Sequence, residues 1–403
     1  MNVLFGHPTG NPNSYQAALA HFEANRLAAF CVPWMPSALT MRMLAHAGPM
    51  RPMAQRLGRR HFPPLASAPK VQGRIAEWRR LAARFLGRTD ERSFHDANDW
   101  LMQTMRRECR HPSVTAVHAY EDCSHLAFLE ARRFDKACIY DMPIGYYPAW
   151  ERMRTELARK YADWLPGGGL PPDSHVRREQ KRREMELADL VLVPSNFVAE
   201  TVREFFPDKV LAFARYGTGP AVWSPPVQRS PRETITFLFA GQCSLRKGIP
   251  LLLEAWEAAG LKHARLQLAG PWQLAQAKLK NLPRSVEWLG PMSSDRLGGY
   301  YDQADVFVLP SYFEGRALAI GEAMSSGLPV LSTPASGADD LLDESCGRIV
   351  QTGNLEALVE GLRWFDNHRE RLPALGRVAR ARAERNSWKN YREQVTQAVA
   401  PFV

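Results

Sequence analysis

Short apolar runs rich in valine, isoleucine, leucine and phenylalanine alternate along this chain with longer segments in which apolar residues recur at helical spacing. This alternation is typical of parallel strands joined by crossover helices. The pattern occurs twice. The first set of expected strands is 2–5, 29–33, 114–119, 137–140, 190–193 and 210–214, and the second is 234–240, 265–269, 286–289, 306–309, 329–332 and 348–350. We therefore predict an α/β fold with two domains.

The boundary between the two halves is expected at residues 216–231, which hold Gly217, Gly219 and four prolines. Neither a helix nor a central strand accepts this composition. We assign residues 1–217 to the first domain and 218–386 to the second. Residues 42–100 show many Arg, Pro and Met residues without a clear strand, and we interpret them as helices and loops inserted in the first domain. Ligands of such sheets bind where strands end and helices begin. If the two sheets face each other, these ends point into one shared crevice, so the site should lie between the domains.

Composition narrows the class of protein further. The 403 residues are 45% hydrophobic and 23% charged, as in folded globular proteins. The six cysteines contain no CxxC pair, no apolar run is long enough to span a bilayer, and the N-terminus turns polar after five residues. A cytoplasmic location is expected. The net charge of +10 favours an anionic partner, which can be nucleotide phosphates, an acidic membrane or nucleic acid.

The most informative segment is residues 305–330, DVFVLPSYFEGRALAIGEAMSSGLPV. It predicts a strand, a loop with Glu314, a helix with Glu322 about two turns in, and a stop at Gly327. The two carboxylates could hold separate hydroxyl groups of one ligand. The free backbone N–H groups at the helix start are candidates to hold a phosphate, namely those of Arg316, Ala317, Leu318 and Ala319.

This segment resembles the family-four retaining glycosyltransferases, or group 1 glycosyltransferases, whose hallmark is E-x7-E in an EG…EAM-x-x-G-x-P-V setting. The resemblance implies a GT-B architecture of two Rossmann-like domains facing across a cleft. It implies that Glu322 bonds the donor ribose and that Glu314 contacts the transferred sugar. The alternative is a pair of surface glutamates near a helix start.

A second motif, FLFAGQCSLRKGIP, places Arg246 and Lys247 before a helix that begins near Ile249. Fixed cations there would neutralise a leaving diphosphate. The family often has G-R-x-x-x-x-K-G at this place, whereas this chain has Gly241 followed by Gln242. Both remain donor-binding candidates, with Gln242 in doubt as a phosphate ligand. The alternative for the basic pair is a solvated loop.

Further family landmarks are LAGP at 268–271, VEWLGP at 286–291 and the pair Ser387 and Trp388. By resemblance the loop after VEWLG receives the base, which makes backbone atoms near Leu289, Gly290 and Met292 candidates, although strand-end packing explains them equally well. Residues 387–403 are expected to form a helix that returns to the first domain.

The first half matches the family less closely. Its loop after the first strand contains Gly10 and Asn11, which are candidates for the acceptor-side loop, with Asn13 and Gln16 as the expected helix cap. Relatives often carry a histidine after the strand that reads ACIYD here, and this chain offers Asp141. Asp141 could orient an acceptor hydroxyl or take its proton, or it could be a turn or helix cap.

We therefore expect a nucleotide-sugar donor, no cofactor and no metal, with a glycan, a lipid-linked molecule or a small molecule as acceptor. A nucleotide-sugar epimerase and a non-catalytic donor-binding protein remain alternatives. Nucleic-acid binding is suggested only by RREQKRR at 177–183, where a solvated helix face is the commoner explanation. Residues 74–88, RIAEWRRLAARFLGR, predict an amphipathic helix, which either contacts an anionic membrane at its inner face or packs on its own domain.

Overall fold

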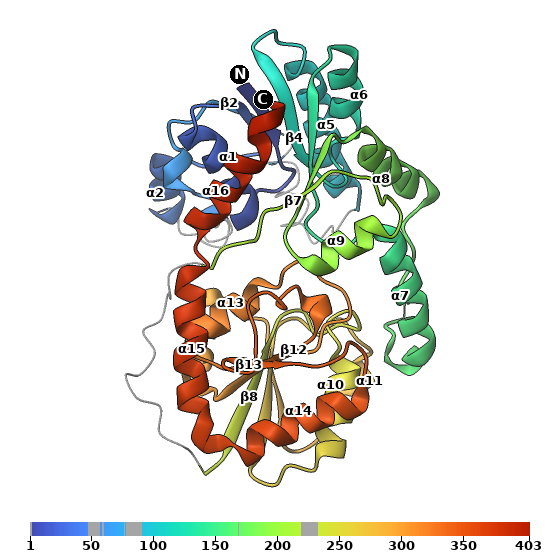
Figure 1. Cartoon of the computed structure of the whole chain (residues 1–403), viewed down its shortest axis with the longest axis vertical. Coiled ribbons are helices and arrows are strands. Elements are labelled where there is room, and N and C mark those ends of the chain that lie inside the picture. Colours follow the sequence, from blue (N-terminus) through green and yellow to red (C-terminus); the bar gives the residue numbers. More distant parts are fainter. Residues whose placement is uncertain are drawn as a thin grey trace.

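The computed structural model describes residues 2–46, 57–58, 60–75, 77, 91–167, 169–218 and 233–403. It contains two parallel sheets, one above the other in Figure 1. The first has the order β3-β2-β1-β4-β5-β6-β7, with β1 Asn2–Gly6, β2 Leu27–Val32, β3 Lys70–Gln72, β4 Val114–Tyr120, β5 Ala137–Asp141, β6 Leu190–Val193 and β7 Leu211–Phe213. The second has the order β10-β9-β8-β11-β12-β13, with β8 Ile235–Ala240, β9 Ala264–Ala269, β10 Val286–Gly290, β11 Val306–Leu309, β12 Val330–Ser332 and β13 Gly347–Ile349.

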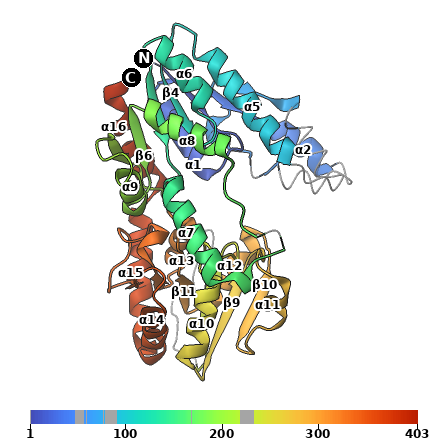
Figure 2. The ribbon, with the colours of Figure 1, turned by 90° about the vertical axis from the view of Figure 1, so that its right-hand side faces the viewer.

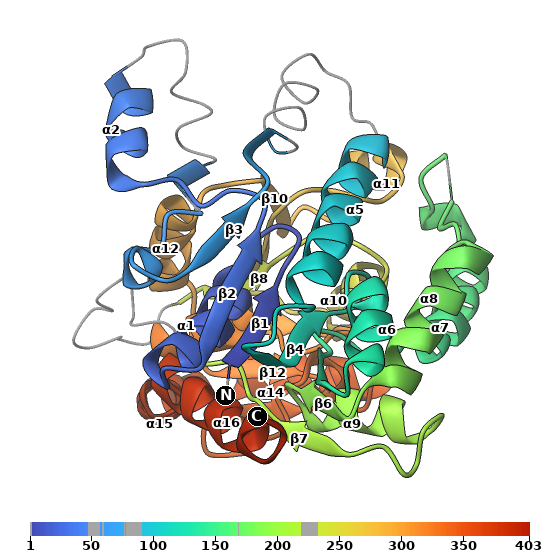
Figure 3. The same ribbon diagram turned by 90° about the horizontal axis from the view of Figure 1, so that it is seen from above.

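The strands are buried because helices cover both faces of each sheet. β6 reads LVLV and β8 reads ITFLFA, and every residue of both is buried. The helices of the first half are α1 Pro12–Glu23, α2 Ala38–His46, α5 Glu91–Glu108, α6 His125–Arg133, α7 Tyr147–Lys160, α8 His175–Leu187 and α9 Asn196–Arg203. Those of the second half are α10 Ile249–Ala259, α11 Gln276–Lys280, α12 Ser294–Gln303, α13 Leu318–Ser325, α14 Leu355–Asn367, α15 Leu372–Arg385 and α16 Trp388–Val399. In Figure 3, α5 and α6 cover one face of the first sheet, and α1 and α16 cover the other.

The last helix, α16, lies beside α1 on the first domain, so both ends of the chain are close together in Figure 1. Tyr391, Val395 and Val399 are fully buried in the core of that domain. The chain crosses back at Asn386, whose carbonyl accepts a 2.6 Å hydrogen bond from the Thr218 amide. The chain therefore passes between the two domains twice, near Thr218 and near Asn386, and these two crossings lie side by side.

A third connection is the end of α7, which descends from the first domain along the second in Figure 2. Leu157 and Tyr161 belong to the core of the second domain although they lie in the first half of the sequence. The Tyr161 hydroxyl donates to Glu254 on α10 at 3.2 Å, and the Ala275 amide donates to the Trp164 carbonyl at 2.9 Å. The segment after α7 is thus packed as part of the second domain.

Two sequence expectations were wrong. Residues 42–100 do contain a strand, β3, which pairs with β2 at the edge of the sheet. Its three residues are half-buried and carry no apolar run, so the pattern gave no signal. The cap of α1 is made by Asn11 and Ser14, whose side chains bond each other's backbone amides, and not by Asn13 and Gln16.

Candidate functional site

Glu314 lies in the loop between β11 and α13 and is paired with both cations of the second motif. Its Oε1 lies 2.7 Å from Arg246 Nη1 and 2.7 Å from Lys247 Nζ. Arg246 Nη1 also donates to the Phe313 carbonyl at 2.9 Å. The Glu314 residue is 8% exposed. The sequence motifs 68 residues apart therefore meet in one cluster, which we call the ion triad: Glu314, Arg246 and Lys247.

The ion triad carries one more positive charge than negative charge. Burial lowers the pKa of Lys247, and Arg246 lowers it further, while Glu314 opposes this change. A second anion near the two cations would therefore be stabilised, and it would favour the charged form of Lys247. An arrangement of this kind can neutralise a diphosphate.

Glu322 lies in α13, and its Oε2 accepts a hydrogen bond from the Tyr301 hydroxyl at 3.1 Å. Burial raises the pKa of this carboxyl group. The side chain is half-buried, so its other lone pairs can serve a ligand hydroxyl. Tyr301 was not identified from the sequence, where it stands in the unremarkable run GGYYDQ before β11.

The start of α13 is only partly available to a phosphate. The Ala317 amide already donates to the Ser336 carbonyl at 3.0 Å. The amides of Leu318 and Ala319 have no acceptor within the described part of the chain. The Arg316 side chain is 3% exposed and donates a hydrogen bond to Asp340 at 2.6 Å, so it is engaged in the fold.

Gly241 directly follows β8, and its φ of 151° lies in a region that residues with a side chain rarely adopt. A Cβ placed there would lie 3.7 Å from Lys247 Cε, so this turn borders the ion triad. Gln242 follows it as an exposed residue. Gly241 and the neighbouring Gln242 therefore lie at the edge of the ion triad. Within the described residues, the Gln242 side chain makes no hydrogen bond to the triad.

Leu289 and Gly290 end β10, and Met292 follows two residues later. Leu289 and Met292 are partly buried against the second core. Gly290 has a φ of 75° and nothing within 4 Å of the place where a Cβ would stand. Its carbonyl accepts from the Gly270 amide at 2.9 Å. Open space beside a strand end suits a flat ring, as the resemblance implies for the base.

The loop of the first domain with Gly10 and Asn11 is organised by His7, which sequence analysis missed. His7 Nδ1 accepts from the amides of Gly10 at 2.8 Å and Thr9 at 3.2 Å. Burial and the charge of Arg60 lower the pKa of His7 to about 3, so the ring is neutral at pH 7. The signal was its place two residues before a Thr-Gly turn that opens a helix.

Asp141 is 2% exposed and lies in a buried polar cluster inside the first domain. Its Oδ2 is 3.5 Å from His118 Nε2, and His118 Nδ1 is 2.8 Å from His21 Nε2. Burial raises the pKa of Asp141 to about 7 and lowers that of His118 to about 3. The structure does not bring Asp141 into the ion triad, and the side chains that it contacts, His118 and Tyr120, belong to the first domain.

The basic run at 177–183 lies in the middle of α8, and several of its charges are paired. Arg177 donates to Asp122 at 2.8 Å, and Lys181 donates to Asp173 at 2.8 Å. Arg182 pairs with Glu179 at 2.6 Å. A helix whose cations are balanced in this way has little free charge to offer a nucleic acid.

The fold and the site define an α/β protein of two domains with the GT-B architecture and a charged site in the loops of its second domain. Residues 234–365 match the family described as "Glycosyl transferases group 1". The match lies within the second domain and covers about a third of the chain. The described residues contain no helix that is both long and apolar enough to cross a membrane.

Two relatives illustrate the match. A sulfoquinovosyl transferase of Arabidopsis thaliana is 29% identical over 226 residues, which cover 50% of this chain but only 42% of that protein. The chain thus spans less than half of that relative. The putative colanic acid biosynthesis glycosyltransferase WcaL of Escherichia coli is 26% identical over 317 residues, which cover 73% of this chain and 74% of WcaL.

Solved structures share the fold over the whole chain. The sucrose-phosphate synthase of Thermosynechococcus elongatus has a TM-score of 0.67 at 16% identity, covering 100% of this chain and 98% of that one. The Anabaena protein HepE, in complex with UDP and glucose, has a TM-score of 0.61 at 14% identity and full coverage of both chains.

Proposed function

We propose that this protein transfers a sugar from a nucleoside-diphosphate sugar to an acceptor, with retention of the anomeric configuration, in glycan or glycoconjugate biosynthesis. The observation that carries the proposal is the ion triad, in which one carboxylate and two cations share a partly buried site next to the start of α13. The family match and the UDP-bound HepE structures support a nucleotide-sugar donor.

In the proposed reaction the bond between the anomeric carbon and the diphosphate oxygen breaks. Negative charge then grows on the diphosphate, and Arg246 and Lys247 neutralise it in a site from which water is largely excluded. The backbone N–H groups of Leu318 and Ala319 would point the positive ends of their dipoles at the same phosphate oxygens. The acceptor oxygen bonds the anomeric carbon on the face that the diphosphate leaves, and its proton passes to the departing phosphate oxygen.

Glu314 changes partners in this scheme. Without donor its carboxylate neutralises part of the charge of Arg246 and Lys247. A bound diphosphate would take over that task and leave Glu314 to bond hydroxyl groups of the transferred sugar. Glu322 would hold the ribose. Because the two side-chain cations supply the charge that a metal ion would otherwise supply, we expect transfer to survive chelation with EDTA.

Purified protein incubated with UDP-, GDP-, ADP- and dTDP-sugars tests the proposal, with glycans, lipid-linked sugars and small alcohols as acceptors. Mass spectrometry should detect a glycosylated product, and NMR should show that the anomeric configuration is retained. Conversion of the donor without an acceptor into its epimer would instead establish an epimerase. Donor binding without turnover of any donor would indicate a binding protein. A product with inverted anomeric configuration would refute the proposed retention.

The same proposal places the enzyme at the inner face of a membrane. Residues 24–76 contain eight basic residues and no acidic one. In α2, Leu39 and Met43 are each 62% exposed and stand one turn apart, with Arg42 between them. Exposed apolar side chains beside unbalanced positive charge suit an anionic lipid surface. Of the amphipathic stretch 74–88, only Arg74, Ile75 and Glu77 fall within the described residues.

Vesicle sedimentation tests this placement. Binding to anionic vesicles should be strong at low salt, weaken as salt screens the cations, and fall with Met43→Glu or Trp78→Glu. Equal recovery with neutral and anionic vesicles, or none with either, would refute it. Arg246→Ala is the matched comparison, because it should weaken donor binding and leave vesicle binding unchanged.

A further inference from the structure

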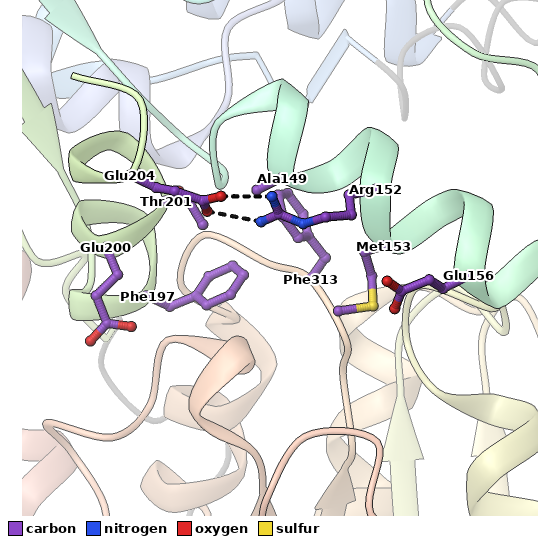
Figure 4. A pocket seen from close by; sticks show the side chains of 9 residues that line it. All are labelled: Ala149, Arg152, Met153, Glu156, Phe197, Glu200, Thr201, Glu204 and Phe313. Atoms are coloured by element: carbon purple, nitrogen blue, oxygen red, sulfur yellow. Dashed lines mark hydrogen bonds and ion pairs between the residues drawn. The ribbon is translucent and has the colours of Figure 1, made fainter.

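The loop that carries Glu314 belongs to the second domain, but the side chain before it is held by the first. Phe313 is 2% exposed. Its ring centroid lies 5.3 Å from that of Trp150 on α7 and 5.2 Å from that of Phe197 on α9. Figure 4 shows the Phe313 side chain where these two helices approach each other. An aromatic side chain of the second domain thus lies between Phe197 of the first domain and Trp150 of α7, the helix that links the two domains.

Gly145 closes this site on a further side. A Cβ added to Gly145 would lie 2.5 Å from Phe313 Cζ and 3.0 Å from Cε1, distances that force the ring to move. Only a residue without a side chain leaves room for the ring in its present place. We call Gly145, Trp150 and Phe197 the socket of Phe313.

The backbone on both sides of Glu314 is fixed to the groups that matter for the proposed reaction. The Phe313 carbonyl accepts from Arg246 Nη1 at 2.9 Å, and the same nitrogen donates to Glu314 Oε1 at 2.7 Å. On the other side, the Gly315 carbonyl accepts from the Ser195 hydroxyl of the first domain at 2.6 Å. A shift of the Phe313 ring would therefore displace a carbonyl and a carboxylate that share one guanidinium.

The Phe313 ring also has space on one side. A cavity of about 240 Å³ lies beside it and is bordered by Met153 of α7 and Thr201 of α9. Figure 4 shows both side chains around this space. A ring that is pushed from the Gly145 side can move into the cavity without unfolding the domain.

We propose that Phe313 is a positioning residue: its seating in the socket of the first domain sets the geometry of Glu314 and Arg246 in the second. Correct contact between the domains then becomes a condition for a working ion triad. This inference rests on the proposed transferase function, because it assigns a role in that reaction to residues that do not touch the donor.

Three variants test the coupling: Gly145→Ala, Phe313→Leu and the two combined. Each single change should lower kcat about tenfold and alter the donor KM less than about threefold, because it moves Glu314 and leaves nucleotide contacts in place. Leucine lacks the Cε1 and Cζ atoms that the new Cβ would meet. The double variant should therefore recover to within about threefold of the wild type.

Gly361→Ala is the matched control, since its Cβ would press on Leu331 at 2.7 Å in the second core, away from the site. It should lower the melting temperature and leave kcat unchanged. The coupling is refuted if the single variants keep wild-type kcat, or if their losses add in the double variant.

A second measurement does not depend on turnover. Hydrogen exchange of the peptide covering residues 310–317 should be faster in each single variant and return toward the wild-type rate in the double variant. Unchanged exchange in all three variants would refute the coupling. If no donor is turned over by the wild type while exchange behaves as expected, the proposed function fails and the socket contact stands.

Discussion

The two polar clusters of this molecule hold charge in opposite ways. In the second domain, one carboxylate, Glu314, lies between two cations, Arg246 and Lys247, which leaves an excess of positive charge. In the first domain, burial raises the pKa of Asp141 to about 7 and lowers that of His118 to about 3, so both are largely neutral between about pH 3 and pH 7. The ion triad is suited to an anionic ligand, whereas the Asp141 cluster resists charge of either sign.

This difference assigns different tasks to the two clusters. A site that must stabilise developing negative charge needs cations already fixed in place. A neutral, buried cluster is suited to hydrogen bonding and to shaping the adjacent surface. Asp141 is therefore a weaker candidate for the residue that takes the acceptor proton than its sequence position suggested, because its side chain is only 3% exposed.

The largest expected effect is that of Glu314→Gln. We expect kcat to fall about 10²- to 10³-fold, because the amide cannot take the place of the carboxylate at the sugar. The affinity for UDP should be unchanged or higher, since Arg246 and Lys247 lose their anionic partner. Initial rates and calorimetric titration with UDP measure the two quantities. Near-normal transfer would remove Glu314 from the reaction.

Glu322→Ala should act on binding instead. We expect the donor KM to rise about 10- to 30-fold with kcat within about threefold, because the ribose hydroxyls are far from the reacting atoms. Tyr301→Phe is the control: it removes the 3.1 Å hydrogen bond to Glu322 and keeps the carboxylate, so a smaller change is expected. A large fall in kcat with unchanged KM would exchange the roles of Glu322 and Glu314.

Sequence reasoning predicted more in the second domain than in the first. All six strands of the second sheet were predicted, and the signal was strongest for β8 and β11, which are nearly continuous apolar runs. The resemblance of residues 305–330 to the group 1 glycosyltransferases is supported by the family match over residues 234–365. In the first sheet, β3 was missed because an edge strand of three half-buried residues needs no apolar pattern.

Contacts between residues that are far apart in the sequence could not be predicted from local patterns. Arg246 meets Glu314 because β8 and β11 are neighbours in the sheet. Local sequence patterns do not predict which strands are neighbours. The insertion of Phe313 into the first domain depends on how the two domains approach. The packing of Tyr161 in the second core likewise depends on the direction of α7. The roles assigned to individual site residues stay predictions that the variants above can test.

Asp141→Asn tests whether the Asp141 cluster is neutral. A carboxyl with a pKa of about 7 in the folded state holds its proton where the unfolded chain has lost it. Between about pH 4 and pH 7 the folded state therefore binds more protons, so Asp141 makes stability fall as pH rises. Between pH 5 and pH 8, the free energy of unfolding of the Asn variant should rise by on the order of 2 kcal/mol relative to that of the wild type.

Melting temperatures of the two proteins at pH 5 and pH 8 measure this effect, and the difference between variants removes the contribution of other groups. His118, whose pKa is lowered, changes stability in the opposite direction and is common to both proteins. A constant difference between the proteins across this range would mean that Asp141 is already charged at pH 5. The contrast between the two clusters would then disappear.

The smallest expected effect concerns His7, which organises the loop beside the buried cluster. His7→Ala leaves the amides of Thr9 and Gly10 without their acceptor, which should cost about 1–2 kcal/mol. In His7→Asn, the side-chain oxygen can stand where Nδ1 stands, so most of the stability should be kept. Thermal unfolding at pH 7 compares the two variants, because His7 is neutral there. If both lost the same stability, packing of the ring against Tyr120, 4.7 Å away, would be the main contribution of His7. If Asn kept stability but lost transfer, the ring itself would be required on the acceptor side, and the first domain would have a polar residue that contributes directly to the reaction.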